Sequence, residues 1–140
     1  MPIFNESDGI SSTLRTLDQV LSAEGSQVEL FIQDDCSTDQ TEKVIKAIAP
    51  QLRMTVYLQK NESNKSHGPT TFNAYQRAVK SKNVIILQLD SDGQFDPREI
   101  PQVIDSVDDE HKVALGIRTA RTDPWFRKAL TRLLSTYLKI

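Results

Sequence analysis

The chain alternates short apolar segments of strand length with longer segments of helical periodicity, and this alternation constrains the fold more than any other feature. Four segments are rich in β-branched and other apolar residues and are predicted to be strands: 28–33, 54–59, 83–89 and 112–116. Because helical segments separate the strands, the sequence predicts an α/β fold with a mostly parallel sheet and right-handed crossovers. In such a sheet, ligands bind beyond the carboxyl ends of the strands.

Apolar spacing and capping residues predict the helices that connect these strands. In the first helix, Ile10, Leu14 and Leu17 recur at helical spacing and are expected to face the core. Asp39 is expected to cap the second helix. That helix should end near Pro50, because proline lacks the N–H that would continue the helical hydrogen bonding.

The third helix is expected over residues 70–80, after a polar loop at 60–69. Its predicted inner face consists of the apolar residues Phe72, Tyr75, Ala78 and Val79. Asp96 as N-cap and Pro97 at the first helical position predict the start of a fourth helix. Asp123 and the proline that follows it predict a fifth helix that runs to the end of the sequence.

The composition is that of a single globular domain, assigned to residues 1–140. Hydrophobic residues make up 38% and charged residues 26% of the chain, which is enough for one core. A net charge of −2 and a pI of about 5.7 give no basis for non-specific nucleic-acid binding. The single cysteine, Cys36, excludes an internal disulfide and a cysteine-rich metal site. With no signal-peptide pattern and no apolar run near about 20 residues, a cytoplasmic location is expected.

The first candidate site is Asp90-Ser91-Asp92, which directly follows the predicted strand at 83–89. A turn of this kind can direct two carboxylates at one hard divalent cation, which prefers oxygen ligands. Gly93 permits a tight turn, and Gln94 offers a further amide oxygen. A solvated turn rich in Asp and Gly is the alternative, but the position at the carboxyl end of a strand favours a metal site.

The second candidate site is the acidic segment 34–39, which follows the predicted strand at 28–33. One of its carboxylates could accept a hydrogen bond from the ring N–H of a nucleobase while another caps the next helix. The spacing is equally consistent with turn and cap residues alone. Cys36 is expected to be a small turn residue, because no activating base lies beside it in the sequence.

Other functions also place an acidic pair in a loop or on a parallel sheet. An EF-hand calcium loop needs Gly at its sixth and Glu at its twelfth position, but from Asp90 these positions hold Phe95 and Pro101. A receiver-like signalling domain needs an acidic pair after its first strand and a lysine that ends a late strand, whereas Lys112 begins the last predicted strand. The receiver-like domain stays open as a weaker alternative, as does a non-catalytic nucleotide-binding fragment.

Three ordered blocks resemble glycosyltransferase family 2: residues 2–6 (PIFNE), 34–41 (DDCSTDQT) and 90–97 (DSDGQFDP). The resemblance extends over nearly the whole chain and implies a GT-A fold, a Rossmann-like α/β fold for nucleotide-diphosphate sugars. The HGPTT block at 67–71 and the basic tail around Arg118 resemble the dolichyl-phosphate mannose synthase-like branch of the polyprenyl-phosphate sugar transferases. His67 itself is expected to be a loop residue, since no second His or Cys is spaced for zinc.

The resemblance assigns roles to individual residues. It implies nucleotide-sugar binding by Pro2, Phe4, Glu6, Asp35, Asp90 and Ser91, with Asp35 reading the base. It implies metal binding by Asp90, Asp92 and Gln94, and catalytic roles for Asp92, Arg118 and Arg127. The two arginines are expected to hold phosphate groups on the acceptor side, which suits their forked guanidinium groups.

The resemblance also implies a reaction. A sugar would pass from a UDP- or GDP-sugar to a polyprenyl or dolichyl phosphate at a membrane surface, with inversion and with Mg²⁺ or Mn²⁺ as cofactor. A phosphate oxygen is already ionised at neutral pH, so the acceptor would need no general base. Family members begin with a full strand before the first block and continue beyond the last helix, so the chain is expected to be truncated at both ends.

Overall fold

The computed structural model describes residues 1–22, 27–81, 85–93, 95–108, 110 and 112–116. Its sheet consists of β1 (Pro2–Ile3), β2 (Glu29–Asp34) and β3 (Thr55–Lys60), in the order β1-β2-β3. Both strand pairs are parallel, so the predicted α/β fold with a parallel sheet is confirmed. The bounds of β2 and β3 lie one residue later than predicted, which is within the usual scatter of strand ends.

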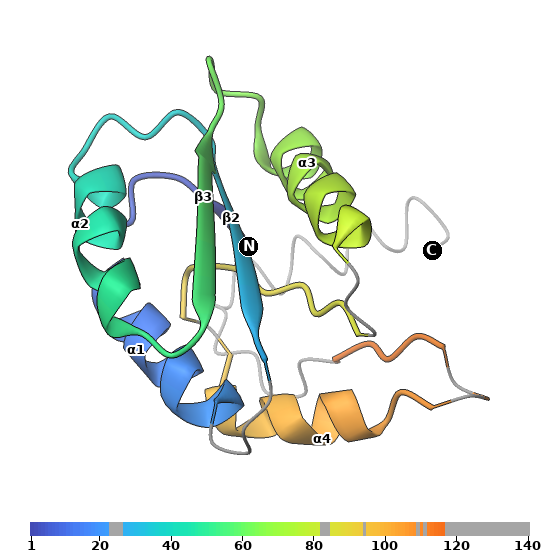
Figure 1. Cartoon of the computed structure of the whole chain (residues 1–140). Helices are drawn as coiled ribbons and strands as arrows, with labels where there is room; N and C mark the ends of the chain where they lie inside the picture. Colours follow the sequence, from blue (N-terminus) through green and yellow to red (C-terminus); the bar gives the residue numbers. More distant parts are fainter. Residues whose placement is uncertain (23–26, 82–84, 94, 109, 111, 117–140) are drawn as a thin grey trace, which may run out of the picture.

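Helices cover both faces of this sheet (Figure 1). α1 (Ile10–Leu21) and α2 (Thr41–Ile48) lie on one side of the sheet, and α3 (His67–Lys80) lies on the other. α4 (Ile100–Asp105) contacts α1. None of the helices in the described part of the chain is long and apolar enough to cross a membrane.

The main core is built from α1, α2 and the side of the sheet that they cover. Ile10, Leu14 and Leu17 of α1 are fully buried, as their spacing predicts, and so are Ile32 of β2 and Ile45 of α2. The register pairs β2 with β3 residue by residue, so side chains opposite each other share a face.

Asp18 is a buried carboxylate that joins α1 to the chain just before β3. Its Oδ1 accepts hydrogen bonds from the backbone N–H groups of Arg53, at 2.7 Å, and Met54, at 2.9 Å. Its Oδ2 lies 3.1 Å from Nε of Arg53. Burial alone would raise the pKa of Asp18, but the hydrogen bonds from Met54 and Arg53 hold this pKa below its ordinary value.

Capping follows the sequence closely in one helix and less closely in another. Asp96 is the N-cap of the 3₁₀ helix η2 (Pro97–Glu99) that leads into α4, and its side chain accepts a hydrogen bond from the N–H of Arg98. The N-cap of α2 is Gln40 rather than Asp39. Asp39 still satisfies the first turn, because its Oδ1 accepts the N–H of Thr41 at 2.9 Å.

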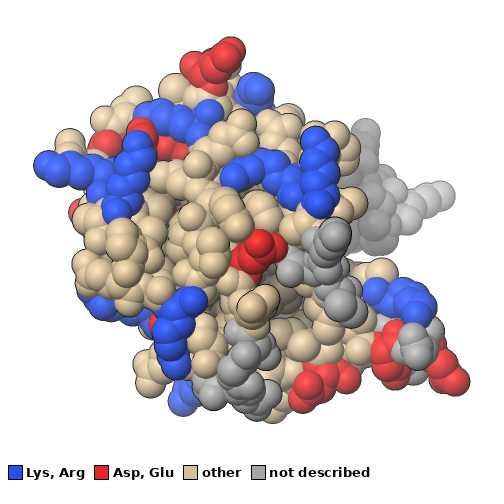
Figure 2. All heavy atoms as spheres, in the orientation of Figure 1, with Lys and Arg blue, Asp and Glu red and all other residues tan. Residues whose placement is uncertain are grey.

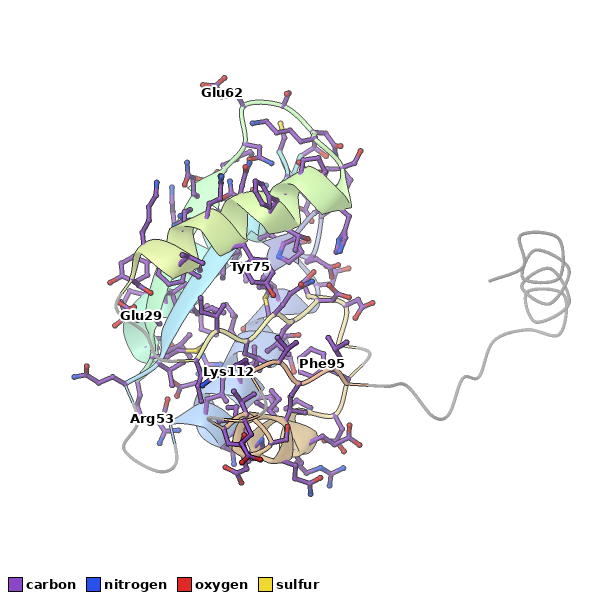
Figure 3. The ribbon with its side chains drawn as sticks, turned by 90° about the vertical axis from the view of Figure 1, so that its right-hand side faces the viewer. Glu29, Arg53, Glu62, Tyr75, Phe95 and Lys112 are labelled. Atoms are coloured by element: carbon purple, nitrogen blue, oxygen red, sulfur yellow. The ribbon has the colours of Figure 1, made fainter. Side chains whose placement is uncertain are left out.

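α3 begins at His67 rather than at Thr70, so the predicted loop is shorter than expected. The connection from β3 extends over residues 61–66, with Glu62 at its tip (Figure 3). The longer helix places its first turn beside the ends of the strands.

The predicted inner face of α3 is wrong. The buried residues of α3 are Thr70 and Ala74, and of the four apolar residues expected to face inward only Ala78 is half-buried. The other three are exposed: Val79 by 65%, Phe72 by 61% and Tyr75 by 40%. Polar contacts set the orientation, because Arg77 points to the sheet and donates to the carbonyl oxygens of Ile32 and Tyr57.

The described residues 85–89 do not form the strand predicted at 83–89, and residues 82–84 lie outside the described part. Pro2 of β1 has no backbone N–H, so it cannot donate a hydrogen bond to a strand on that edge. Leu87 and Leu89 nevertheless pack against the core. The segment lines a largely apolar cavity of about 550 Å³, which Tyr75 also lines from the underside of α3 (Figure 3).

The last predicted strand, at 112–116, is also irregular. Val113 and Leu115 are 75% and 82% exposed, so this segment lacks the burial that would favour a strand in a sheet. The fifth helix, predicted from Asp123, lies outside the described residues.

Candidate functional site

A cavity of about 460 Å³ lies at the carboxyl ends of the strands. Four segments that are far apart in the sequence line it: the end of β1, the residue after β2, the entry into α3 and the turn at 90–92. This cavity is lined by all six residues predicted to bind a nucleotide sugar: Pro2, Phe4, Glu6, Asp35, Asp90 and Ser91. Asp92 lines it as well. The structure therefore brings both acidic candidate sites to one place, as expected for the carboxyl edge of a parallel sheet.

Three non-glycine residues in the loops at this edge adopt left-handed backbone conformations: Asn5 (φ 54°), Cys36 (φ 67°) and Ser66 (φ 70°). Such conformations are costly and persist where surrounding contacts enforce them. Here the loops hold each other, because Asn5 donates its N–H to Oγ of Ser37 and accepts the N–H of Thr38 at 2.8 Å. The edge of the cavity is thus cross-linked by hydrogen bonds before any ligand binds.

The acidic segment after β2 divides into structural residues and one cavity residue. Asp34 is fully buried and its Oδ1 accepts the N–H of Ser37 at 2.9 Å. Asp39 accepts from Thr41 and from the N–H of Ser7. Only Asp35 of these three carboxylates lines the cavity. Asp34 and Asp39 therefore accept hydrogen bonds within the turn and at the start of α2, whereas Asp35 borders the cavity. Base recognition by Asp35 stays a prediction.

Asp35 is held firmly although it borders a cavity. It is only 4% exposed, and its Oδ1 accepts hydrogen bonds from Nδ2 of Asn61, at 2.8 Å, and from the N–H of Lys65, at 2.7 Å. Burial alone would raise the pKa of Asp35, but the hydrogen bonds from Lys65, Asn61 and Thr70 outweigh it and lower this pKa. Asp35 is therefore an ionised, acceptor-only group at neutral pH.

Besides Asp35, the lining of the cavity includes three carboxylates, those of Glu6, Asp90 and Asp92. Ser91 donates a hydrogen bond to Oε1 of Glu6 at 3.4 Å, which joins the turn at 90–92 to the loop after β1. Burial raises the pKa of Glu6, and the negative charges of Asp92 and Asp39 raise it further against the effect of the Ser91 hydrogen bond. The local field at these carboxylates is therefore negative.

The residues at 90–92 have the chemistry that a hard divalent cation requires. Asp90 and Asp92 offer carboxylate oxygens on the cavity wall, which is the ligand type that a hard divalent cation prefers. Gln94, the third predicted ligand, lies outside the described residues. Within the described ranges, no group of three or more His, Cys, Asp or Glu side chains is arranged to hold a metal.

The entry into α3 contributes cavity residues that the sequence analysis did not assign. His67, expected to be a loop residue, is the first residue of α3 and its Nε2 lies 3.8 Å from Oδ1 of Asp90. Asn64, Ser66 and Thr70 also line the cavity. The HGPTT block at 67–71 is the sequence signal for this part of the cavity, and the structure shows that the block begins α3 rather than preceding it.

The two arginines predicted to act on the acceptor side, Arg118 and Arg127, lie outside the described residues. Their roles remain predictions. The described cavity thus contains the donor-side part of the predicted site.

The comparisons with known proteins extend over almost the whole chain. The family model described as glycosyl transferase family 2 matches residues 1–139. A protein of Edwardsiella ictaluri called undecaprenyl-phosphate 4-deoxy-4-formamido-L-arabinose transferase is 30% identical over 138 residues, which is 96% of this chain and 41% of that protein. A protein of Klebsiella pneumoniae with the same name is 24% identical over 139 residues, 99% of this chain and 42% of the relative.

An archaeal relative of no stated activity also matches. An uncharacterized protein of Methanocaldococcus jannaschii is 28% identical over 130 residues, which is 91% of this chain and 54% of that protein. The chain therefore spans about half or less of the length of these relatives.

Proposed function

The chain belongs to glycosyltransferase family 2, and from that premise we propose that it transfers a sugar from a nucleotide-diphosphate donor to a polyprenyl phosphate. The observation that carries the proposal is the meeting of Asp35, Asp90 and Asp92 in one cavity at the carboxyl ends of parallel strands. The relatives named as undecaprenyl-phosphate sugar transferases support the acceptor class. Family membership sets aside the receiver-like alternative.

On the donor side, Asp35 and the turn at 90–92 would have different roles. Asp35, ionised and fixed by its hydrogen bonds, would accept an N–H of the base. Pro2 and Phe4 would border the nucleoside, and the cavity volume of about 460 Å³ is in the usual range for small-molecule sites. Asp90 and Asp92 would lie at the diphosphate end.

The diphosphate end requires positive charge, because carboxylates and a diphosphate repel each other. Asp90 and Asp92, with Gln94, would hold Mg²⁺ or Mn²⁺ there. When bound, such an ion supplies the charge that neutralises the departing nucleoside diphosphate. His67 is placed 3.8 Å from Asp90 and would constrain the direction of that carboxylate.

The transfer itself would need little further chemistry from the protein. A phosphate oxygen of the acceptor is ionised at neutral pH and would attack the anomeric carbon from the face opposite the leaving group, with inversion. Arg118 and Arg127 would hold the acceptor phosphate through their forked guanidinium groups. The lipid part of such an acceptor places the reaction at a membrane surface, which we assign to the cytoplasmic face.

The experiment that tests the proposal measures nucleotide binding with and without metal. Isothermal titration calorimetry of the protein with UDP- and GDP-sugars should give binding that strengthens on addition of Mn²⁺. Asp92→Asn should abolish this metal dependence, because it removes one charged oxygen ligand. Asp105→Asn is the matched control: it makes the same change on an exposed residue of α4 and should behave like the unsubstituted protein.

The outcomes separate the alternatives. Metal-dependent binding followed by transfer of labelled sugar to a polyprenyl phosphate would support the full proposal. Binding without transfer would indicate a non-catalytic nucleotide-binding protein. Equal affinity with and without Mn²⁺ in the unsubstituted protein, or undiminished metal dependence in Asp92→Asn, would contradict the metal assignment.

A further inference from the structure

A buried chain of polar side chains lies behind Asp35, on the side away from the cavity. Nη1 of Arg77 donates to Oε1 of Gln33 at 3.2 Å, and Nε2 of Gln33 donates to Oδ1 of Asn61 at 2.8 Å. Nδ2 of Asn61 then donates to Oδ1 of Asp35 at 2.8 Å and to Oγ1 of Thr70 at 3.0 Å. Gln33 and Asn61 are 2% and 6% exposed, so water cannot replace these partners easily.

The direction of this chain is fixed at its outer end. An arginine guanidinium has only donors, so the side-chain oxygen of Gln33 must face Arg77. The amide nitrogen of Gln33 then faces Asn61, and the amide nitrogen of Asn61 in turn faces Asp35.

Arg77 is itself held in place by further contacts, so the donor-to-acceptor direction of the hydrogen bonds that start from it does not change. Its Nη1 also donates to the carbonyl oxygen of Ile32 at 3.1 Å, and its Nη2 donates to that of Tyr57 at 3.3 Å. Its guanidinium carbon lies 5.5 Å from the centre of the Phe31 ring, which stacks on Tyr57.

The hydrogen-bonded series of side chains therefore ends in an N–H donor, Nδ2 of Asn61, that points to the carboxylate of Asp35. Asp35 receives this N–H and the backbone N–H of Lys65 on the same oxygen. Both bonds favour the ionised carboxylate and fix its plane. A carboxylate fixed in this way offers the cavity acceptors and no donor.

We infer that these hydrogen-bonded side chains, the relay Arg77–Gln33–Asn61, make the cavity selective for nucleobases that present a ring N–H to Asp35. This inference rests on the proposed function. Uracil and guanine carry a ring N–H at this edge and match a fixed acceptor. Cytosine and adenine carry a ring nitrogen lone pair at the same position, which faces the carboxylate unfavourably. Asn61 and Gln33 are positioning residues, because they act on the base only through Asp35.

The relay can be reversed without touching the cavity. In Gln33→Glu, the new carboxylate pairs with Arg77 but has no N–H to give to Asn61. The amide of Asn61 then turns its nitrogen toward the new carboxylate and its oxygen toward Asp35. Asp35 thereby loses the hydrogen bond from Asn61. Neither Gln33 nor Asn61 lines the cavity, so a direct effect on the nucleotide is not expected.

The test measures the affinities of UDP, CDP, GDP and ADP for the protein by calorimetry in the presence of Mn²⁺. The unsubstituted protein should bind UDP more tightly than CDP, and GDP more tightly than ADP. Gln33→Glu should lower both ratios by about 10-fold or more, the size expected for losing a hydrogen bond to a charged group. Asn61→Ala, which removes the donor altogether, should lower them in the same direction.

Gln59→Glu is the matched control. Gln59 lies opposite Gln33 in the register of β2 and β3 but is exposed, so the same added charge should leave both ratios unchanged. Thermal unfolding of each variant establishes that it is folded, and Asn61→Ala decides the question if Gln33→Glu does not fold.

The outcomes distinguish this inference from the proposed function. Equal loss of affinity for all four nucleotides in both variants would mean a merely structural network and would overturn the inference. Unchanged ratios in both variants, or a preference of the unsubstituted protein for CDP and ADP, would also overturn it while leaving nucleotide binding intact. If the unsubstituted protein binds no nucleoside diphosphate, the proposed function fails, and the inference fails with it.

Discussion

Replacing Asp18 by alanine should destabilise the fold, because it removes a buried acceptor that joins α1 to the chain before β3. Oδ1 of Asp18 accepts two backbone N–H groups, those of Arg53 and Met54. Met54 is 3% exposed, so its N–H would be left without a protein partner and with little access to water in Asp18→Ala. Such an orphaned buried donor costs about 1–3 kcal/mol.

A second contribution comes from the side chain of Arg53. Its Nε lies 3.1 Å from Oδ2 of Asp18, and the Arg53 side chain is 56% exposed, so this ion pair is worth at most about 1 kcal/mol. The N–H of Arg53 belongs to an exposed residue and can bind water instead. The expected total for Asp18→Ala is therefore about 3 kcal/mol in the free energy of unfolding.

The more conservative change separates the two contributions. Asp18→Asn keeps an oxygen that can accept both N–H groups and loses only the charge, so it should cost about 1 kcal/mol. Asp8→Ala is the matched control on an exposed aspartate and should stay within about 0.5 kcal/mol of the unsubstituted protein.

Urea unfolding at pH 7, followed by circular dichroism, gives these free energies if the slope m is the same in all variants. A loss below about 1 kcal/mol in Asp18→Ala would refute the assignment of a buried, satisfied donor at Met54. Equal losses in Asp18→Ala and Asp18→Asn would show that charge, rather than hydrogen-bond acceptance, is what α1 needs at this position.

Three further predictions concern pH and backbone conformation. The pKa of Asp18 is lowered in the folded protein, so ionised Asp18 stabilises the fold above the unfolded pKa of about 3.9, and this stabilisation is lost as the pH falls through the folded pKa. In Asp18→Asn, the urea midpoint should therefore decline less steeply between pH 5 and 2. The pKa of Glu6 is raised, so ionised Glu6 costs stability as the pH rises, and Glu6→Gln should raise the melting temperature at pH 8 more than at pH 4; an equal shift at both would contradict this. Gly93→Ala should cost about 1 kcal/mol in urea unfolding because φ is 65° there while no atom crowds the new Cβ, whereas Gly68→Ala in α3, with equally open space and no positive φ, should be neutral or slightly stabilising.

The sequence by itself determined the fold class and the place of the site. Apolar periodicity in α1 identified Ile10, Leu14 and Leu17 as core residues, and all three are buried. The acidic segments that follow apolar, strand-like patterns predicted Asp35 and Asp90 to be neighbours, and both line the cavity although residues 85–89 do not form the predicted strand. The core positions of α1 depend on residues close together in sequence, so a local pattern suffices to predict them.

Only the tertiary structure decided which polar groups are buried and what they contact. The inward face of α3 carries Thr70 and Ala74 rather than the apolar Phe72, and hydrogen bonds from Asn61 to Thr70 and from Arg77 to Ile32 join this face to the sheet. The segment 85–89 is strongly apolar but is not a strand, because strand formation depends on a backbone partner that the local sequence does not specify. Hydrogen-bond partners and strand neighbours come from distant parts of the chain, so the relay behind Asp35 becomes visible only once the chain is folded.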